Sequence, residues 1–117
     1  MSQFFVNAFN ALKKPVFQNC LAKNMWPGPQ SDKTIFFSDK GIILDKLIGI
    51  VDELNAAQAA VHVGNPPNDK CPGFSDLEVE LADAVIRILD LAGGANLRVA
   101  EALIAKHTFN SITRPRR

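Results

Sequence analysis

The sequence predicts an all-α protein, and three observations support this fold class. Apolar residues recur every three or four positions over four segments, no stretch alternates convincingly with a period of two, and loops rich in proline and glycine separate the segments. Four helices joined by such loops favour a four-helix bundle. At 117 residues the chain has room for one hydrophobic core but not two, so residues 1–117 are expected to form a single helical domain.

The first half of the chain is expected to contain two helices. Residues 3–23 form the first, kinked or split at Pro15 because proline removes a helical hydrogen bond. Two prolines and a glycine within 24–31 then predict a loop. The second helix is predicted over 39–61, with Ser38 as its N-cap.

The second half is expected to contain two more helices. Ser75 and Glu78 have the spacing of a capping box, which predicts a third helix over 76–92. Gly93 and Gly94 are expected to end that helix. Asn96 is a suitable cap for a fourth helix over 97–109.

The composition argues against several classes of protein. No apolar run approaches the roughly 20 residues needed to span a bilayer, and the N-terminus lacks the basic region of a signal peptide, so we expect a cytoplasmic protein without a membrane partner. A net charge of +1 provides no field that would attract nucleic acid. Cys20 and Cys71 lack the spacing of a metal or redox motif and are expected to stay reduced.

A stripe of charged residues follows one narrow face of the predicted third helix, and it has two interpretations. It is either a solvated face with an Asp83–Arg87 ion pair, or a partly buried face on which Glu80 and Asp83 meet a neighbouring helix. In the second case the two carboxylates repel each other unless a cation such as Mg²⁺ binds their hard oxygens. The stripe consists of Asp76, Glu80, Asp83, Arg87 and Asp90.

The predicted second helix carries a complementary face. Glu53 shares this face with small residues that either allow tight helix packing, with Glu53 at the rim, or leave room for a metal or ligand. The small residues are Gly49, Ala56, Ala57 and Ala60.

Together these residues resemble the MazG-like branch of the all-α NTP pyrophosphohydrolases. The similarity covers about residues 40–116 and rests on Glu53, Glu80-x-x-Asp83, a Gly-Gly turn and the closing segment Lys106-x-x-Phe-Asn110-x-x-Thr-Arg-Pro115. It implies a helical bundle of that type. It also implies hydrolysis of a nucleoside triphosphate between the α and β phosphates, which gives a monophosphate and pyrophosphate and removes unwanted nucleotides.

The resemblance further implies roles for individual residues. Glu53, Glu80 and Asp83 would be catalytic residues that hold Mg²⁺, with Asp52 as an additional acid near the metal. Lys106 and Asn110 would help to hold the triphosphate. An alternative for Lys106 is a cation that suits the dipole at the end of the fourth helix.

Two further residues are candidates for substrate binding. Arg114 belongs to a basic tail that either contacts phosphate or is solvated. Trp26 either stacks on a nucleotide base or lies in the core.

One departure from the family pattern keeps other functions open. Ala56 stands where the family has a second glutamate, and Asp76, one turn before Glu80, is a candidate to supply the missing oxygen. The alternatives are a weak or inactive relative that binds a nucleotide or a protein, and a structural bundle that self-associates. Broad apolar helix surfaces, together with the resemblance, also predict a homodimer or homotetramer.

Overall fold

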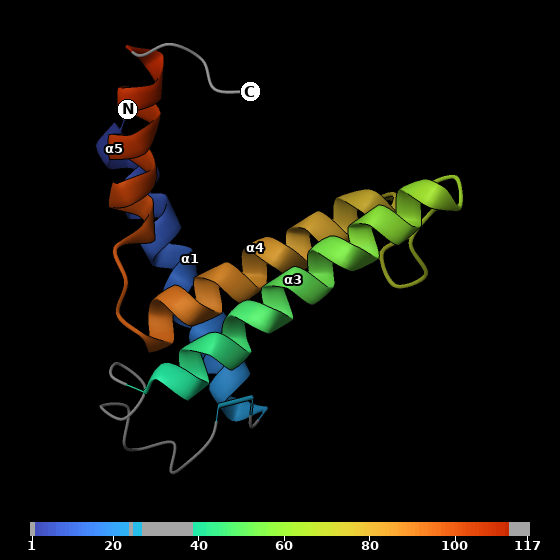
Figure 1. Cartoon of the computed structure of the whole chain (residues 1–117), viewed down its shortest axis with the longest axis horizontal. Coiled ribbons are helices and arrows are strands. Elements are labelled where there is room, and N and C mark those ends of the chain that lie inside the picture. Colours follow the sequence, from blue (N-terminus) through green and yellow to red (C-terminus); the bar gives the residue numbers. More distant parts are fainter. Residues whose placement is uncertain (1, 24, 27–38, 113–117) are drawn as a thin grey trace.

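The structure is a computed structural model that describes residues 2–23, 25–26 and 39–112 (Figure 1). Within these residues the prediction of an all-helical fold is confirmed, because the regular elements are four helices and no strand is present. The helices are α1 (Ser2–Ala22), α3 (Lys40–His62), α4 (Asp76–Gly94) and α5 (Val99–Ser111). None of them is long and apolar enough to cross a membrane. Arg114, Ser38 and most of the loop predicted over 24–31 lie outside the described residues.

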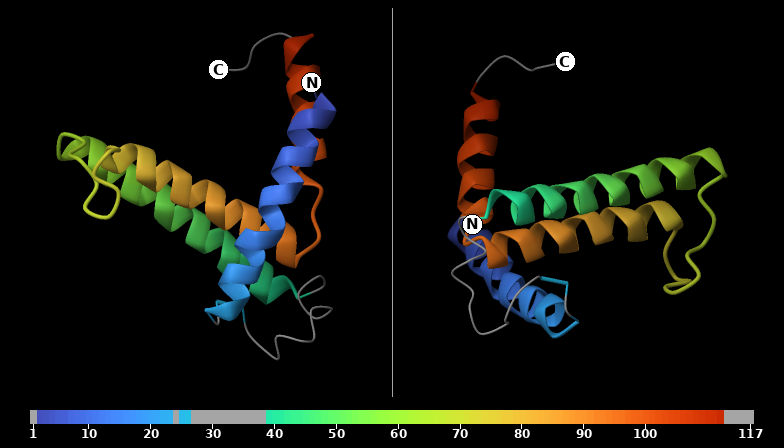
Figure 2. Two further views of the ribbon diagram at one scale, coloured as in Figure 1. Left: turned by 180° about the vertical axis from the view of Figure 1, so that it is seen from behind. Right: turned by 60° about the horizontal axis from the view of Figure 1, so that its bottom comes forward.

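The helices form two arms that meet at an angle (Figure 1). Helices α3 and α4 pack side by side as a long antiparallel hairpin, and α1 packs across α4 near the open end of that hairpin. Helix α5 leaves the hairpin and packs against α1 instead. The left view of Figure 2 shows α1 in front of α5, away from the far end of the hairpin. Among the described helices, α1 therefore covers part of the length of the hairpin and leaves the rest of it uncovered.

The core lies where α1 crosses the end of α4. The aromatic rings of Phe17 and Trp26 meet edge to face there, with their centroids 5.5 Å apart. This edge-to-face arrangement suits the charge distribution of aromatic rings and contributes beyond the area that the rings bury. The buried core residues are Phe17, Cys20, Leu21, Trp26, Leu91 and Ala95.

The first helix was predicted to be kinked or split at Pro15, and the structure shows that it is not split. The chain is helical from Ser2 to Ala22 with Pro15 inside. One missing hydrogen bond is tolerated because Phe17 and Leu21, which follow the proline, are buried in the core and hold this part of α1 in place.

The capping box at the start of α4 is confirmed. The hydroxyl oxygen of Ser75 accepts a hydrogen bond from the backbone N–H of Glu78 at 3.2 Å, and Glu78 Oε1 accepts one from the Ser75 N–H at 2.9 Å. At the start of α3 the N-cap is Asp39, whose side chain accepts from the Ile42 N–H at 3.0 Å, and not Ser38 as predicted.

The end of α4 differs from the prediction. Helix α4 ends at Gly94, so it includes Gly93 and runs two residues beyond the predicted end at residue 92. A side chain at Gly93 would come within 2.7 Å of Phe17, and one at Gly94 would overlap the ring of Trp26, so both glycines also permit close packing. Asn96 follows α4 with a positive φ of 55° and does not cap α5, whose N-cap is Arg98.

Candidate functional site

Three carboxylates meet midway along the α3–α4 hairpin. Glu53 comes from α3, while Glu80 and Asp83 lie one turn apart on α4. One oxygen of each lies within 4.8 Å of the oxygens of the other two, and all three side chains are partly buried. The structure thus brings together the three residues that the sequence analysis named as catalytic and metal-binding.

The electrostatics of this cluster favour binding of a cation. Partial burial raises the pKa of Glu80, and the negative charges of Glu53 and Asp83 raise it further. Carboxylate oxygens are the ligands that Mg²⁺ prefers, and two oxygens on one Mg²⁺ are at most about 4.2 Å apart, given bonds of roughly 2.1 Å. Small side-chain movements would therefore let all three residues bind one ion.

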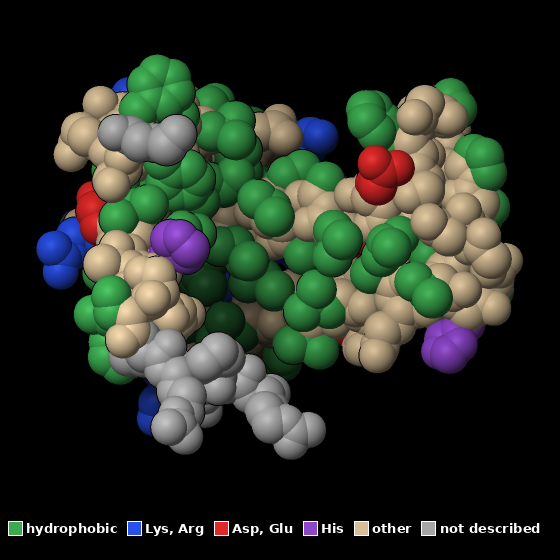
Figure 3. Space-filling model, turned by 90° about the horizontal axis from the view of Figure 1, so that it is seen from above, with side chains coloured by type: hydrophobic (Ala, Val, Ile, Leu, Met, Phe, Trp, Pro, Cys, Tyr) green, Lys and Arg blue, Asp and Glu red, His purple; other side chains and the backbone are tan. Residues whose placement is uncertain are grey.

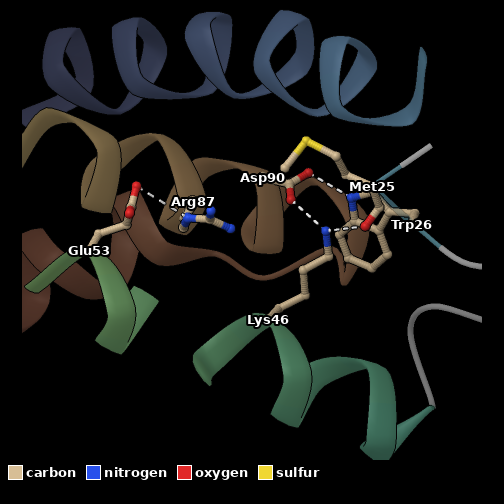
Figure 4. A network of polar contacts seen from close by, with 6 residues as sticks. All are labelled: Met25, Trp26, Lys46, Glu53, Arg87 and Asp90. Atoms are coloured by element: carbon tan, nitrogen blue, oxygen red, sulfur yellow. Dashed lines mark hydrogen bonds and ion pairs between the residues drawn. The ribbon is translucent and has the colours of Figure 1, made fainter. Parts of the chain in front are cut away.

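Arg87, one turn after Asp83, links α4 to α3. Its Nε lies 3.4 Å from Glu53 Oε2 (Figure 4). In the interpretation of a solvated stripe, Arg87 would instead pair with Asp83 on its own helix. The guanidinium lies over Gly49, where an added Cβ would approach Arg87 Nη1 to 2.9 Å. The small residue at position 49 therefore makes room for Arg87.

A hollow of about 270 Å³ lies beside Glu80. Ala56 of α3 and Asp76 of α4 both line it, together with Ala59, Ala60 and Val63. Asp76 does not belong to the group of three clustered carboxylates, and its Oδ1 accepts a hydrogen bond from Asn68 Nδ2 at 2.9 Å. The short side chain of Ala56 thus leaves open space, which Asp76 borders without entering the cluster.

Asp90, the last residue of the predicted stripe, has a structural role. It is only 2% exposed, and its oxygens accept hydrogen bonds from Trp26 Nε1 at 2.6 Å and Lys46 Nζ at 2.9 Å (Figure 4). Lys46 also donates to the carbonyl of Met25 at 2.7 Å. Trp26 itself is 4% exposed, which supports its interpretation as a core residue and leaves no free face for a nucleotide base.

The remaining predicted site residues do not join the carboxylates within one chain. Asp52 is exposed on α3 and lies outside the cluster. Lys106 and Asn110 are exposed on α5, which belongs to the other arm (Figure 1). The ammonium group of Lys106 lies 4.7 Å from the ring centre of Phe109.

Comparisons with family models, curated proteins and solved structures found no match for this chain.

Proposed function

We propose that the protein is a Mg²⁺-dependent nucleoside triphosphate pyrophosphohydrolase that releases pyrophosphate and a nucleoside monophosphate. The observation that carries this proposal is the convergence of Glu53, Glu80 and Asp83 from two helices into one partly buried group. The resemblance of the sequence to MazG-like enzymes, which includes these three residues, supports it. Such an enzyme would act on the nucleotide pool of the cytoplasm.

In this proposal the carboxylate cluster binds the metal, and the hollow beside it accommodates water. Glu53, Glu80 and Asp83 hold the metal, and each still has a second oxygen that can accept a hydrogen bond from water. When bound, Mg²⁺ neutralises phosphate charge and orients a water for in-line attack. The hollow next to Glu80 has room for such a water, since one water occupies about 30 Å³.

The test is a screen for pyrophosphate release over canonical and modified nucleoside triphosphates with Mg²⁺. We expect release from at least one of them, and a loss of about 100-fold or more in Glu80→Gln and in Asp83→Asn, which each remove one charged ligand. Glu101→Gln, an exposed acid on α5, is the matched control and should retain full activity. Unchanged activity in both cluster variants would contradict the proposed site.

Ala56 supports a second candidate function, a module that binds nucleotides with little or no turnover. Ala56 borders the hollow where a longer carboxylate would reach toward Glu80. Ala56→Glu discriminates between the two functions. A large gain in turnover would show that the natural site is impaired, whereas loss of activity or no change from an active wild type would show that the site is complete without a carboxylate at position 56.

We further propose that the chain forms a homodimer or homotetramer. Hydrophobic side chains gather on the face shown in Figure 3. On the hairpin, Leu44, Leu47, Ile48, Val51, Leu54, Val61, Leu81, Val85 and Ile86 are exposed.

Light scattering during size-exclusion chromatography tests the oligomeric state. We expect a mass of two or four chains, because burying an apolar face of this kind is favourable. Val51→Glu would place a charge beside the apolar groove that Val51, Leu54 and Leu81 line, and should yield monomers. A monomeric wild-type protein at micromolar concentration would contradict the prediction.

A further inference from the structure

We propose that Arg87 is the phosphate-binding residue of this site, and that its guanidinium is held on Glu53 until a divalent cation takes that carboxylate. This inference rests on the proposed function and concerns the same site. It assigns phosphate binding to a residue within the hairpin, whereas the sequence resemblance suggested Lys106 and Asn110 on the other arm.

The geometry of Arg87 leaves most of its hydrogen-bonding capacity available. Its Nε faces Glu53 at 3.4 Å, which is too long for a strong charged hydrogen bond. Within the described part of the chain, Nη1 and Nη2 have no hydrogen-bond partner. The side chain is 38% exposed, so a ligand can reach it. A planar guanidinium with free terminal nitrogens is well suited to bind two oxygens of one phosphate.

A cavity of about 430 Å³ opens beside the Arg87 side chain. Its volume lies within the range of pockets that hold small molecules. The other residues lining it are Met25, Ile42, Asp45 and Lys46. Lys46 is paired with Asp90, and the exposed carboxylate of Asp45 opposes an anion, so Arg87 is the lining residue whose positive charge is available to one.

Arg87 therefore pairs with Glu53 of the carboxylate cluster and also lines this cavity. Figure 4 shows Arg87 between Glu53 and Lys46, the latter another residue that lines the cavity. Three ionised carboxylates and one guanidinium leave two negative charges, which one divalent cation would neutralise. A cation bound to one oxygen of Glu53 would weaken the attraction between Glu53 and Arg87, because both positive groups draw on the charge of the same carboxylate. The guanidinium would then be held less firmly and could turn its terminal donors to a phosphate that reaches the site from the cavity.

This competition predicts two opposite effects in Arg87→Ala. Isothermal titration calorimetry with Mg²⁺ alone should show binding several-fold tighter than in the wild type, because Glu53 has lost its competing cation. Titration of inorganic tripolyphosphate in saturating Mg²⁺ should show binding about 10-fold or more weaker, since a charged bidentate contact is lost. Arg87→Lys keeps the positive charge without the planar group. Its affinities for Mg²⁺ and for tripolyphosphate should therefore lie between those of the wild type and of Arg87→Ala. Arg98→Ala, an exposed arginine at the start of α5, is the matched control and should behave like the wild type.

The outcomes separate this inference from the function on which it rests. Wild-type protein that does not bind tripolyphosphate with Mg²⁺ would contradict the proposed function and, with it, the role of Arg87. Wild-type binding that persists unchanged in Arg87→Ala would overturn the role of Arg87 alone. Loss of both Mg²⁺ and tripolyphosphate binding in Arg87→Ala and Arg87→Lys would also overturn it, because a competing cation cannot be required for metal binding.

Discussion

Two ion pairs join α3 to α4 in the described part of the chain, and they differ in how completely their charges are satisfied. Lys46 and Asp90 lie 2.9 Å apart with side chains that are 13% and 3% exposed. Arg87 and Glu53 lie 3.4 Å apart with side chains that are 38% and 18% exposed. The first pair is close and buried, whereas the second is longer and open to solvent.

The partners around each pair sharpen this difference. Asp90 accepts from both Trp26 and Lys46, and the ammonium group of Lys46 also lies 4.2 Å from the Trp26 ring centre. Each charged group there has an opposite charge and additional contacts. Around Glu53, in contrast, two more carboxylates are clustered with a single guanidinium. A satisfied buried pair indicates a structural role, whereas surplus charge in a partly buried site indicates a place for a ligand.

The largest change in stability is expected when the buried ion pair of Lys46 and Asp90 is removed. Asp90→Ala leaves the ammonium group of Lys46 buried without its counter-ion and removes the acceptor for the Trp26 N–H, so it should lower the free energy of unfolding by about 3–5 kcal/mol. Urea denaturation followed by circular dichroism measures this change. A loss below about 1 kcal/mol would mean that the pair does not support the core in this way.

A smaller loss of stability is expected from a substitution at Gly94, which packs against the ring of Trp26. Gly94→Ala would bring a Cβ into the Trp26 ring and should cost about 1–3 kcal/mol as the core rearranges. Gly73→Ala is the matched control, because nothing lies within 4 Å of a Cβ there, and it should change stability by less than about 0.5 kcal/mol. Thermal melts of both variants give the comparison, and equal effects would argue against close packing at Gly94.

The smallest change in stability is expected for a substitution in the carboxylate cluster. Whether the variant gains or loses stability tests the direction of the pKa shift of Glu80. The raised pKa of Glu80 means that its protonated form stabilises the fold, and this contribution is lost as the pH rises through the raised pKa. Without metal, Glu80→Gln should therefore be as stable as the wild type at pH 7 or more stable by about 0.5 kcal/mol or less. Mg²⁺ should then raise the melting temperature of the wild type but not of the variant.

Glu78, two residues earlier, provides the control of opposite sign. The N–H of Ser75 lowers the pKa of Glu78, so its ionised form stabilises the fold above the usual pKa of a glutamate, and this contribution is lost as the pH falls. Glu78→Gln should thus be less stable than the wild type at pH 7, and the difference should shrink below about pH 4. Thermal melts of Glu78→Gln, Glu80→Gln and the wild type between pH 4 and 7 measure these differences in stability. If both variants differed from the wild type with the same sign, the opposite pKa shifts of Glu78 and Glu80 would be contradicted.

Much of the fold could be predicted from the sequence because its signals are local. The start of α4 followed from Ser75 and Glu78, which are three residues apart and satisfy each other's backbone N–H groups. The sequence was less informative at positions whose surroundings depend on residues that are distant in the sequence. Gly93 and Gly94 are typical of a helix end, and α4 ends at Gly94, but their spacing did not predict that Phe17 and Trp26 pack against them.

The candidate site was predictable to a similar extent. The shared face of Glu80 and Asp83 follows from helical geometry. Glu53 was noted for its helix face of small residues, and the resemblance to a family then gave it a role. Asp90 lies on the same face by spacing, but it is buried where Trp26 and Lys46 reach it from other parts of the chain. No local signal marked Lys46, because its role depends on residues more than 20 positions away in either direction.

The sequence by itself determined which segments are helical and which side chains share a helix face, because both follow from contacts between residues within one or two turns. Only the tertiary structure decided that Arg87 pairs with Glu53, that Asp90 is buried, and that α5 carries Lys106 away from the carboxylates. The physical reason is that spacing along a helix sets the direction of a side chain. What that side chain meets depends on how the helices pack.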